Sequence, residues 1–478
     1  MPIVAPISEI ALATADILES HDGVVRPAAP VPQSKPLSTL RFLYDLSRNP
    51  ITAFSDGVYD EPYIYYPSRI RHFLMVNDPE GVKHVMLDNA SNYLKSDQAQ
   101  KRLKPAIGNG LVTAEGASWR FQRRTAAPMF QMRRIAGFAP AMADATEDLL
   151  SRWSALPEGS EIELSSELMH LTYTIISRTV FSNEVKTDYK KMSEALTTYL
   201  DTLGRVDILS ILGAPDWLPT PDRLRARGPM RFFRQELEAL IAQRRARLER
   251  DPSSVPDDLL TLLLTTHDPE GGALFSEAEV YDNVATFFFA GHETTANALA
   301  WTFYLLSQFP EEDAHVAREA RRALDGRVPD AEDVTALPFA RMTIEEAMRL
   351  YPPAPLIGRD AIHADVVGKT AIQPKTAVLI SPWVLHRHRR LWDVPDYFVP
   401  ERFAPGAREK IHRFAYLPFG AGPRICIGMA FAMQEAIIIL SMIAQRFRLE
   451  LVPGHPVEPL ARVTLRPKYG LKMKLHRR

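Results

Sequence analysis

The sequence predicts a mainly α-helical fold with a minor β-sheet. Stretches in which apolar residues recur every three or four positions dominate the chain, whereas strand-like runs are short and lie near its two ends. Of its 478 residues, 46% are hydrophobic, which is enough to bury a large core. The interior contains neither a repeat of fixed period nor a low-complexity linker, so we expect a single domain.

The chain begins with a segment that is poorly suited to a helix. Residues 21–37 carry Pro27, Pro30, Pro32 and Pro36 among small residues. We therefore expect residues 1–37 to form a Pro/Ala-rich extended lead-in and residues 38–478 to form the folded body. Within the body, the clearest helical patterns cover residues 142–153, 229–250, 276–309, 311–324 and 431–447. Strand patterns cover residues 70–76, 377–381 and 463–475.

Composition excludes several classes of protein. The chain has 57 basic and 58 acidic side chains, so no overall field draws it to nucleic acid or to an anionic membrane. A single cysteine excludes an internal disulfide. The N-terminus lacks the pattern of a signal peptide, and the most apolar run, residues 430–444, is interrupted by Gln434 and Glu435. We expect a cytoplasmic protein without a transmembrane anchor.

The one cysteine stands in an unusual loop. Residues 419–428 read Phe-Gly-Ala-Gly-Pro-Arg-Ile-Cys-Ile-Gly, and a helical pattern begins near Met429. Glycines allow the backbone to approach a flat ligand closely, and the N–H groups at a helix start stabilise a thiolate. Cys426 is therefore a candidate metal ligand.

This string resembles Phe-x-x-Gly-x-Arg-x-Cys-x-Gly, the ligand loop of the cytochrome P450 superfamily. The resemblance implies a single-domain cytochrome P450 fold and a soluble, bacterial-type haem-thiolate monooxygenase. It implies that Cys426 ligates the iron of haem b and that Arg424 faces a haem propionate. Phe419 would pack beside the loop, and Gly428 completes the motif.

A second motif lies inside a long apolar helical pattern. Residues 290–294 read Ala-Gly-His-Glu-Thr, and helical spacing places Thr286, Ala290 and Thr294 on one face. This segment resembles the family's Ala-Gly-x-Glu-Thr motif. The resemblance implies that Ala290 lies over the haem, while Glu293 and Thr294 relay protons to dioxygen.

Glu346 and Arg349 lie one helical turn apart and can form an ion pair. Spacing alone is weak evidence, because Glu319 and Arg322 have the same interval. The resemblance implies a structural Glu-Arg-Arg network that Arg402 completes.

Two further patterns resemble family positions that bind haem propionates. Trp119 and Arg123 match Trp-x-x-x-Arg, with an aromatic donor and a cation one turn apart. Arg359 follows Arg349 by ten residues and matches another propionate position. The resemblance also implies a mostly apolar substrate pocket formed by Leu111, Val112, Thr286, Phe289, Ala354 and Leu356.

The expected activity is insertion of one oxygen atom from O2 into an apolar organic substrate. No flavin-binding reductase segment follows the haem part, so we expect electrons from a ferredoxin or flavodoxin with its reductase. A basic face made of Arg120, Arg124, Arg133 and Arg134 could dock this partner, although these could equally be ordinary surface arginines.

Two other functions are compatible with the same motifs. One is a peroxide-driven hydroxylase, although such relatives generally lack the acid–threonine pair. The other is a non-catalytic haem protein that stores or senses a ligand.

Residues 386–390, His-Arg-His-Arg-Arg, could suggest a pair of metal-binding histidines. We expect a solvated basic loop there instead and no second metal, because the neighbouring positive charges repel a cation.

Overall fold

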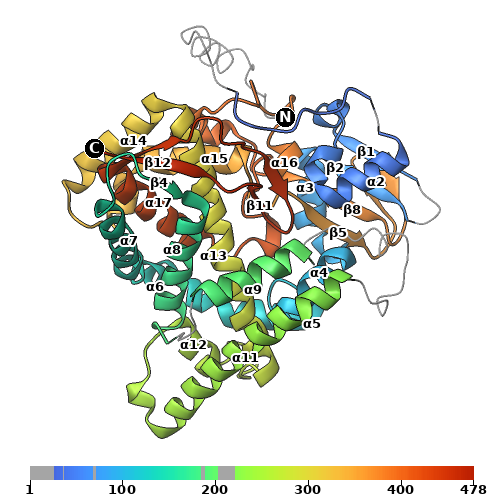
Figure 1. The fold of residues 1–478 in the computed structure, drawn as a ribbon. Coiled ribbons are helices and arrows are strands. Elements are labelled where there is room, and N and C mark those ends of the chain that lie inside the picture. The colour runs from blue at the N-terminus through green and yellow to red at the C-terminus, as the bar shows by residue number, and fades with distance from the viewer. Residues whose placement is uncertain (1–25, 36, 68–70, 185–188, 203–220) are drawn as a thin grey trace.

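The computed structural model describes residues 26–35, 37–67, 71–184, 189–202 and 221–478. As predicted, the fold is mainly helical with small sheets (Figure 1). The α-helices are α2 (Thr39–Arg48), α3 (Pro79–Lys83), α4 (Asp97–Ile107), α5 (Gly116–Ala126), α6 (Met132–Ala136), α7 (Ala139–Ser154), α8 (Leu164–Val180), α9 (Tyr189–Thr202), α11 (Pro221–Arg250), α12 (Leu259–Thr265), α13 (Glu277–Gln308), α14 (Pro310–Leu324), α15 (Pro338–Leu350), α16 (Pro382–Leu385) and α17 (Met429–Arg446).

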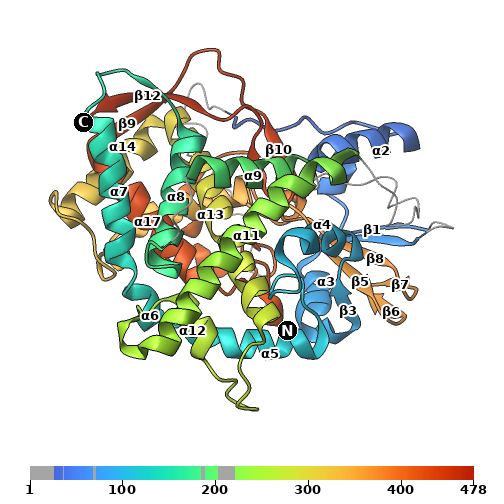
Figure 2. The ribbon, with the colours of Figure 1, turned by 60° about the horizontal axis from the view of Figure 1, so that its bottom comes forward.

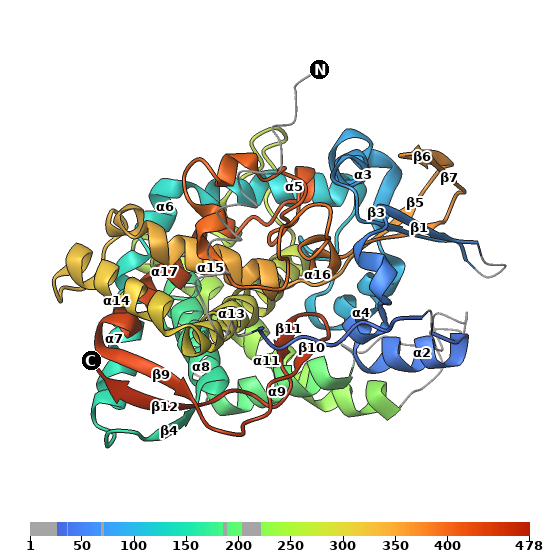
Figure 3. The same ribbon diagram turned by 90° about the horizontal axis from the view of Figure 1, so that it is seen from above.

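The strands are short and form four sheets among the described residues. They are β1 (Tyr63–Tyr66), β2 (Phe73–Val76), β3 (Tyr93–Lys95), β4 (Glu161–Glu163), β5 (Ile357–Ala361), β6 (Asp365–Val367), β7 (Thr370–Ile372), β8 (Ala377–Ile380), β9 (Phe447–Leu451), β10 (Pro459–Ala461), β11 (Leu465–Pro467) and β12 (Lys472–Arg477). The largest sheet has the order β1-β2-β8-β5-β3, with β2 and β8 parallel and its other neighbours antiparallel. The sheet β4-β12-β9 lies at the opposite end of the molecule (Figure 3).

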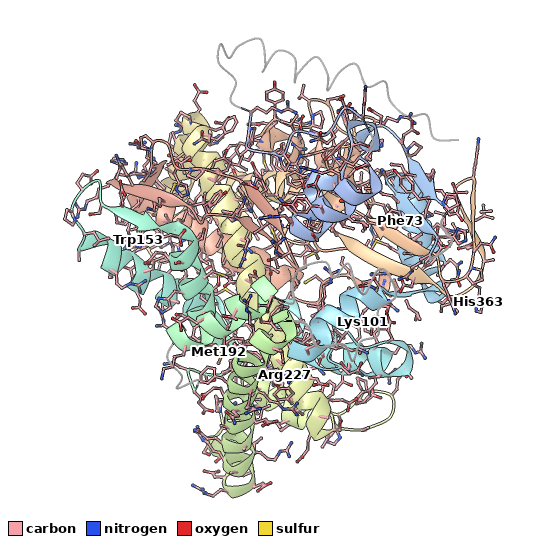
Figure 4. The ribbon with its side chains drawn as sticks, turned by 45° about the vertical axis from the view of Figure 1, so that its right-hand side comes forward. Phe73, Lys101, Trp153, Met192, Arg227 and His363 are labelled. Atoms are coloured by element: carbon pink, nitrogen blue, oxygen red, sulfur yellow. The ribbon has the colours of Figure 1, made fainter. Side chains whose placement is uncertain are left out.

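Helix α13 runs through the middle of the molecule, with helices α7, α8 and α14 on one side and the five-stranded sheet on the other (Figure 1). Figure 4 places Phe73, in that sheet, and Trp153, in α7, on opposite sides. Helices α9 and α11 pack together on the face that Figure 2 brings forward. One large apolar cluster surrounds α13 and α17, and a smaller one underlies the five-stranded sheet.

The local sequence explains the bounds of α13. The Ser276 hydroxyl and the Glu279 carboxylate cap each other's backbone N–H groups at its start. Its last residue precedes Phe309, and Pro310 then opens α14 at a position where its missing N–H costs nothing. A run of 32 helical residues therefore ends where the sequence forces a new direction.

Helix α17 is the one described helix that is long and apolar enough to cross a membrane, and 72% of its 18 residues are buried inside the protein. It therefore serves as a core helix. The extended segment from residue 26 to residue 35 is held to the body, because the Ala28 backbone pairs with the Tyr304 and Tyr351 hydroxyls. The predicted boundary at residue 37 stays a prediction.

The five predicted helices correspond to α7, α11, α13, α14 and α17. The second begins at Pro221 rather than at residue 229, so Pro229 lies inside the helix. The prediction of one strand over residues 463–475 was wrong, because a turn with Gly470 at φ +66° separates β11 from β12. The start of the predicted strand 70–76 falls at residue 70, which lies outside the described residues.

Candidate functional site

The middle of helix α13 is almost completely buried, and the accessible surface of this stretch is confined to the predicted motif. From Asn283 to Leu306, every residue is buried except Ala290, Gly291 and Thr294. The Thr294 hydroxyl donates to the Ala290 carbonyl at 2.8 Å, which fixes its side chain on that face. The absence of a side chain at Gly291 also lets α8 approach, since a Cβ there would lie 2.5 Å from the Ile176 Cδ1 atom.

The cysteine loop adopts a conformation that requires its glycines. Gly420 and Gly422 have φ values of +71° and +69°. A Cβ on Gly422 would lie 1.9 Å from the Met86 carbonyl oxygen, so this glycine permits close packing against protein backbone. The Cys426 N–H donates to the Phe419 carbonyl at 2.9 Å, which closes the loop before α17 begins.

The Cys426 side chain is accessible, yet it is largely enclosed by protein. Burial raises the pKa of the thiol, while a hydrogen bond from the Gly428 backbone and the charge of Arg123 lower it. Burial likewise lowers the pKa of Arg123, which the sulfur partly opposes. A thiolate therefore needs a positive partner here, such as a metal ion, to be stable at neutral pH.

Four cations gather around the strand β3 and the cysteine loop, and the carboxylate of Glu115 lies among them. Arg424 forms a two-point ion pair with Glu115, with 2.9 Å between its Nη1 and Oε1, and stacks 5.5 Å from the centre of the Trp119 ring. Burial and Arg424 lower the pKa of Arg359 to about 10. Arg123 completes the guanidinium set that the sequence predicted.

Sequence reasoning missed the fourth cation, Lys95. Its ammonium donates to the carbonyls of Leu111 and Ala114 at 2.9 and 2.8 Å. Burial, together with the charges of Arg424 and Arg359, lowers its pKa to about 7 against the opposing effect of Glu115. Glu115, 309 residues away from its partner Arg424, was missed as well. No local sequence signal distinguishes Lys95 or Glu115 from surface charges.

This donor set fits the haem that the resemblance implies. The thiol of Cys426 could ligate the haem iron, and the guanidinium groups of Arg123, Arg359 and Arg424 outnumber the carboxylate of Glu115 that pairs with Arg424. Haem carries two propionate carboxylates, and guanidinium groups bind carboxylates with charge-assisted hydrogen bonds. Phe419 is partly buried against the same core.

Glu293 is buried and has a specific partner in the structure. Its Oε1 accepts a hydrogen bond from the Thr464 hydroxyl at 2.7 Å. Thr464 lies in the turn between β10 and β11, which is far from α13 in sequence. Glu293 is therefore held by the C-terminal part of the chain, and sequence reasoning did not identify this contact.

The predicted ion pair between Glu346 and Arg349 forms inside the core. Both side chains are fully buried, and the Arg349 Nε lies 2.7 Å from the Glu346 Oε2. Arg402 joins the pair with its Nε 3.4 Å from the Glu346 Oε1, and burial lowers its pKa to about 10. The second pair with this spacing does not form, because Glu319 instead accepts from the Phe339 and Ala340 N–H groups at the start of α15.

The prediction of a solvated basic loop at residues 386–388 was wrong. His386, Arg387 and His388 are all buried. The His386 ring accepts from the Leu417 N–H at 2.8 Å, and Arg387 stacks 3.7 Å from the centre of the Trp383 ring. The aromatic ring and the backbone acceptors replace water around these groups. The described residues contain no cluster of three potential metal ligands among His, Cys, Asp and Glu side chains.

The predicted pocket residues differ in accessibility. Leu111, Thr286 and Phe289 are buried, Leu356 is partly buried, and Val112 and Ala354 are exposed. The Leu111 N–H donates to the Asn283 Oδ1 at 3.1 Å, which anchors this loop on α13. Phe289 packs edge-on against Tyr199 of α9, with 5.9 Å between ring centres.

Two of the four arginines proposed as a docking face already have acidic partners. Arg124 pairs with Asp268 and Glu270 at 2.6 and 2.7 Å, and Arg134 pairs with Asp257 at 2.9 Å. Arg124 holds the pKa of Asp268 down at about 2. Arg120 and Arg133 are exposed. The positive charge of this face is thus smaller than the sequence suggested.

Comparison with known proteins agrees with this site. A family model described as Cytochrome P450 matches residues 59–475. Cyclooctatin synthase of Streptomyces melanosporofaciens is 34% identical, over 81% of this chain and 83% of that protein. Pentalenene oxygenase of Streptomyces avermitilis is 33% identical, over 83% of this chain and 86% of that protein.

The fold leads to the same result. The crystal structure of the cytochrome P450DA heme domain superposes with a TM-score of 0.82 at 25% identity, and the match covers 95% of this chain and 99% of that one. The chain therefore belongs to the cytochrome P450 family and is a haem-containing monooxygenase.

Proposed function

We propose that Cys426 supplies the thiolate ligand of the haem iron and that the accessible face of α13 forms the oxygen-binding side. One observation carries this assignment. Between Asn283 and Leu306 of α13, only Ala290, Gly291 and Thr294 are accessible. When bound, haem supplies the iron on which dioxygen is reduced and cleaved.

Residues of this chain hold the cofactor and manage protons. Arg123, Arg359, Arg424 and Lys95 bind the two propionates, and Trp119 supports Arg424. Glu293 takes up protons from water and passes them to the Thr294 hydroxyl, which donates toward the oxygen side. We assign the Glu346–Arg349–Arg402 network a structural role, because Glu346 and Arg349 are fully buried as an ion pair and Arg402 lies beside the same carboxylate.

We propose an apolar alkene as the substrate. The predicted pocket residues Leu111, Phe289, Ala354 and Leu356 are apolar. The name of one relative, pentalenene oxygenase, gives an alkene as its substrate, and we transfer this class to our chain. An apolar pocket binds such a body by excluding water from it.

The electron donor in this proposal is a separate ferredoxin or flavodoxin with its reductase, acting in the cytoplasm. Arg120 and Arg133 are exposed near α5 and α6 and offer positive charge to an acidic partner.

A spectral titration tests the substrate class. The ferric protein is titrated with pentalenene, a fatty acid, a steroid and a small aromatic acid. We expect pentalenene to displace water from the iron and shift the spin state from low to high. A shift with the two carboxylates and none with pentalenene would overturn the proposed class.

A further inference from the structure

Thr464 lies outside every motif discussed so far. It belongs to the turn between β10 and β11, and 6% of its surface is exposed. Its hydroxyl donates to the Glu293 Oε1 at 2.7 Å, and both groups are buried. A buried hydrogen bond to a carboxyl group is strong, because neither partner can exchange it for water.

A third residue fixes the direction of this bond. The Asn297 Nδ2 donates to the Thr464 Oγ1 at 3.4 Å. A threonine hydroxyl has one proton, so Thr464 accepts from Asn297 and donates to Glu293. Asn297 follows Glu293 by four residues on α13, so the hydroxyl bridges two successive turns of the same helix.

The turn that carries Thr464 is itself tied to the core. The Trp301 Nε1 donates to the Leu465 carbonyl at 3.2 Å, and the Leu465 N–H donates to the Pro353 carbonyl at 3.0 Å. At the other end, the Asn49 side chain holds Pro459 and Ala461 of β10 at 2.8 and 3.0 Å. The position of the Thr464 hydroxyl is therefore set by the framework and not by a free loop.

We propose that Thr464 is a positioning residue for the proton-donating Glu293. By holding Oε1, it fixes the rotamer of the carboxyl group, and we assign the proton exchange with Thr294 to Oε2. Because Pro353 precedes the exposed Ala354 of the predicted pocket, the same turn also ties this acid to the segment that contacts substrate. The inference rests on the proposed role of Glu293.

The test uses the haem-loaded full-length protein with Thr464→Val, Thr464→Ser and the control Thr302→Val. Thr302 is also a buried threonine, but it lies on α13, and its hydroxyl donates to the Ala298 carbonyl of its own helix at 2.8 Å. A plant-type ferredoxin and its reductase supply electrons without organic substrate. Peroxide is measured per O2 consumed: two electrons and two protons yield H2O2, whereas four of each yield two waters.

We expect Thr464→Val to lower the flux of O2 to water about tenfold and to raise the peroxide fraction, because proton delivery contributes at least ~100-fold when fully in place. Thr464→Ser should restore both values, Thr302→Val should leave them unchanged, and all variants should keep the carbon monoxide spectrum. A wild-type peroxide fraction in Thr464→Val would overturn the inference. If Glu293→Gln also leaves the fraction unchanged, the proposed role of Glu293 fails instead.

Discussion

All five N–H donors of Arg349 are used, and two of them bind Glu346. Its Nε and Nη2 donate to the two Glu346 carboxylate oxygens at 2.7 and 2.8 Å. The remaining donors reach the carbonyls of His386, Pro395 and Tyr397 at 2.8, 2.7 and 2.8 Å. A fully buried cation is tolerated only when it is satisfied in this way.

We therefore expect Arg349→Leu to destabilise the protein by about 3–5 kcal/mol, because the variant leaves Glu346 buried without its main partner. Chemical denaturation measures the loss. Arg322→Ala is the matched control, since Arg322 has the same spacing from Glu319 but is exposed, and its effect should stay within about 0.5 kcal/mol. Equal effects of the two substitutions would contradict the buried network.

Thr294→Ala should bind substrate normally but divert electrons to hydrogen peroxide. The hydroxyl lies on the one accessible patch in the buried part of α13, and its removal interrupts the proton path without changing apolar contacts. The measurements are the spin-state titration and the ratio of peroxide to oxygen consumed. Fully coupled product formation in this variant would count against a role of Thr294 in proton delivery.

Stability should fall in mild acid because of His386. Burial lowers the pKa of this ring to about 3, whereas the unfolded residue titrates near 6.5. Below pH 6.5 the unfolded state binds a proton that the folded state does not, so stability is lost as pH falls from 6.5 toward 3. The expected slope is about 1.4 kcal/mol per pH unit.

Denaturant unfolding of His386→Gln between pH 6.5 and 4.5 measures this contribution. The variant should be less stable at pH 7, because the Leu417 N–H loses its acceptor. Its free energy of unfolding should change less steeply with pH, because unfolding takes up about one proton fewer. If the unfolding free energy of the variant changed with pH as steeply as that of the wild type, the His386 ring would take up its proton in the folded state as well.

Charge reversal tests the docking face. Arg120→Glu and Arg133→Glu should slow reduction by an acidic ferredoxin at low ionic strength and have less effect in high salt. Arg322→Glu, on the distant helix α14, controls for net charge. Arg124→Glu would instead break the ion pairs with Asp268 and Glu270, so it does not report on docking alone. Equal reduction rates in Arg133→Glu and the control would show that this face does not dock the ferredoxin.

The sequence predicted the long helices well, because the periodicity of α13, α14 and α17 extends over many turns. It predicted strands less well, since most strands of this protein are only three or four residues long and such short segments contain almost no periodic signal. The misjudged segment around Arg387 shows a further limit. A string of cations reads as solvated, and only the fold brings Trp383 and the backbone carbonyls around it.

Motif residues that share one element were found from the sequence, whereas contacts between distant segments were not. Glu293 and Thr464 are 171 positions apart, and Arg424 and Glu115 are 309 apart. Neither contact leaves a local pattern, because one depends on how α13 packs against the turn between β10 and β11, and the other on how the cysteine loop packs against the start of α5.

The carbon monoxide spectrum of the reduced protein tests the assignment of Cys426 most directly. Thiolate ligation should produce a red-shifted Soret band in the wild-type protein, and Cys426→Ser should lose this band, because Cys426 is the one cysteine of the chain and no other thiolate can replace it. A Cys426→Ser protein that binds haem and keeps the red-shifted band would contradict the assignment.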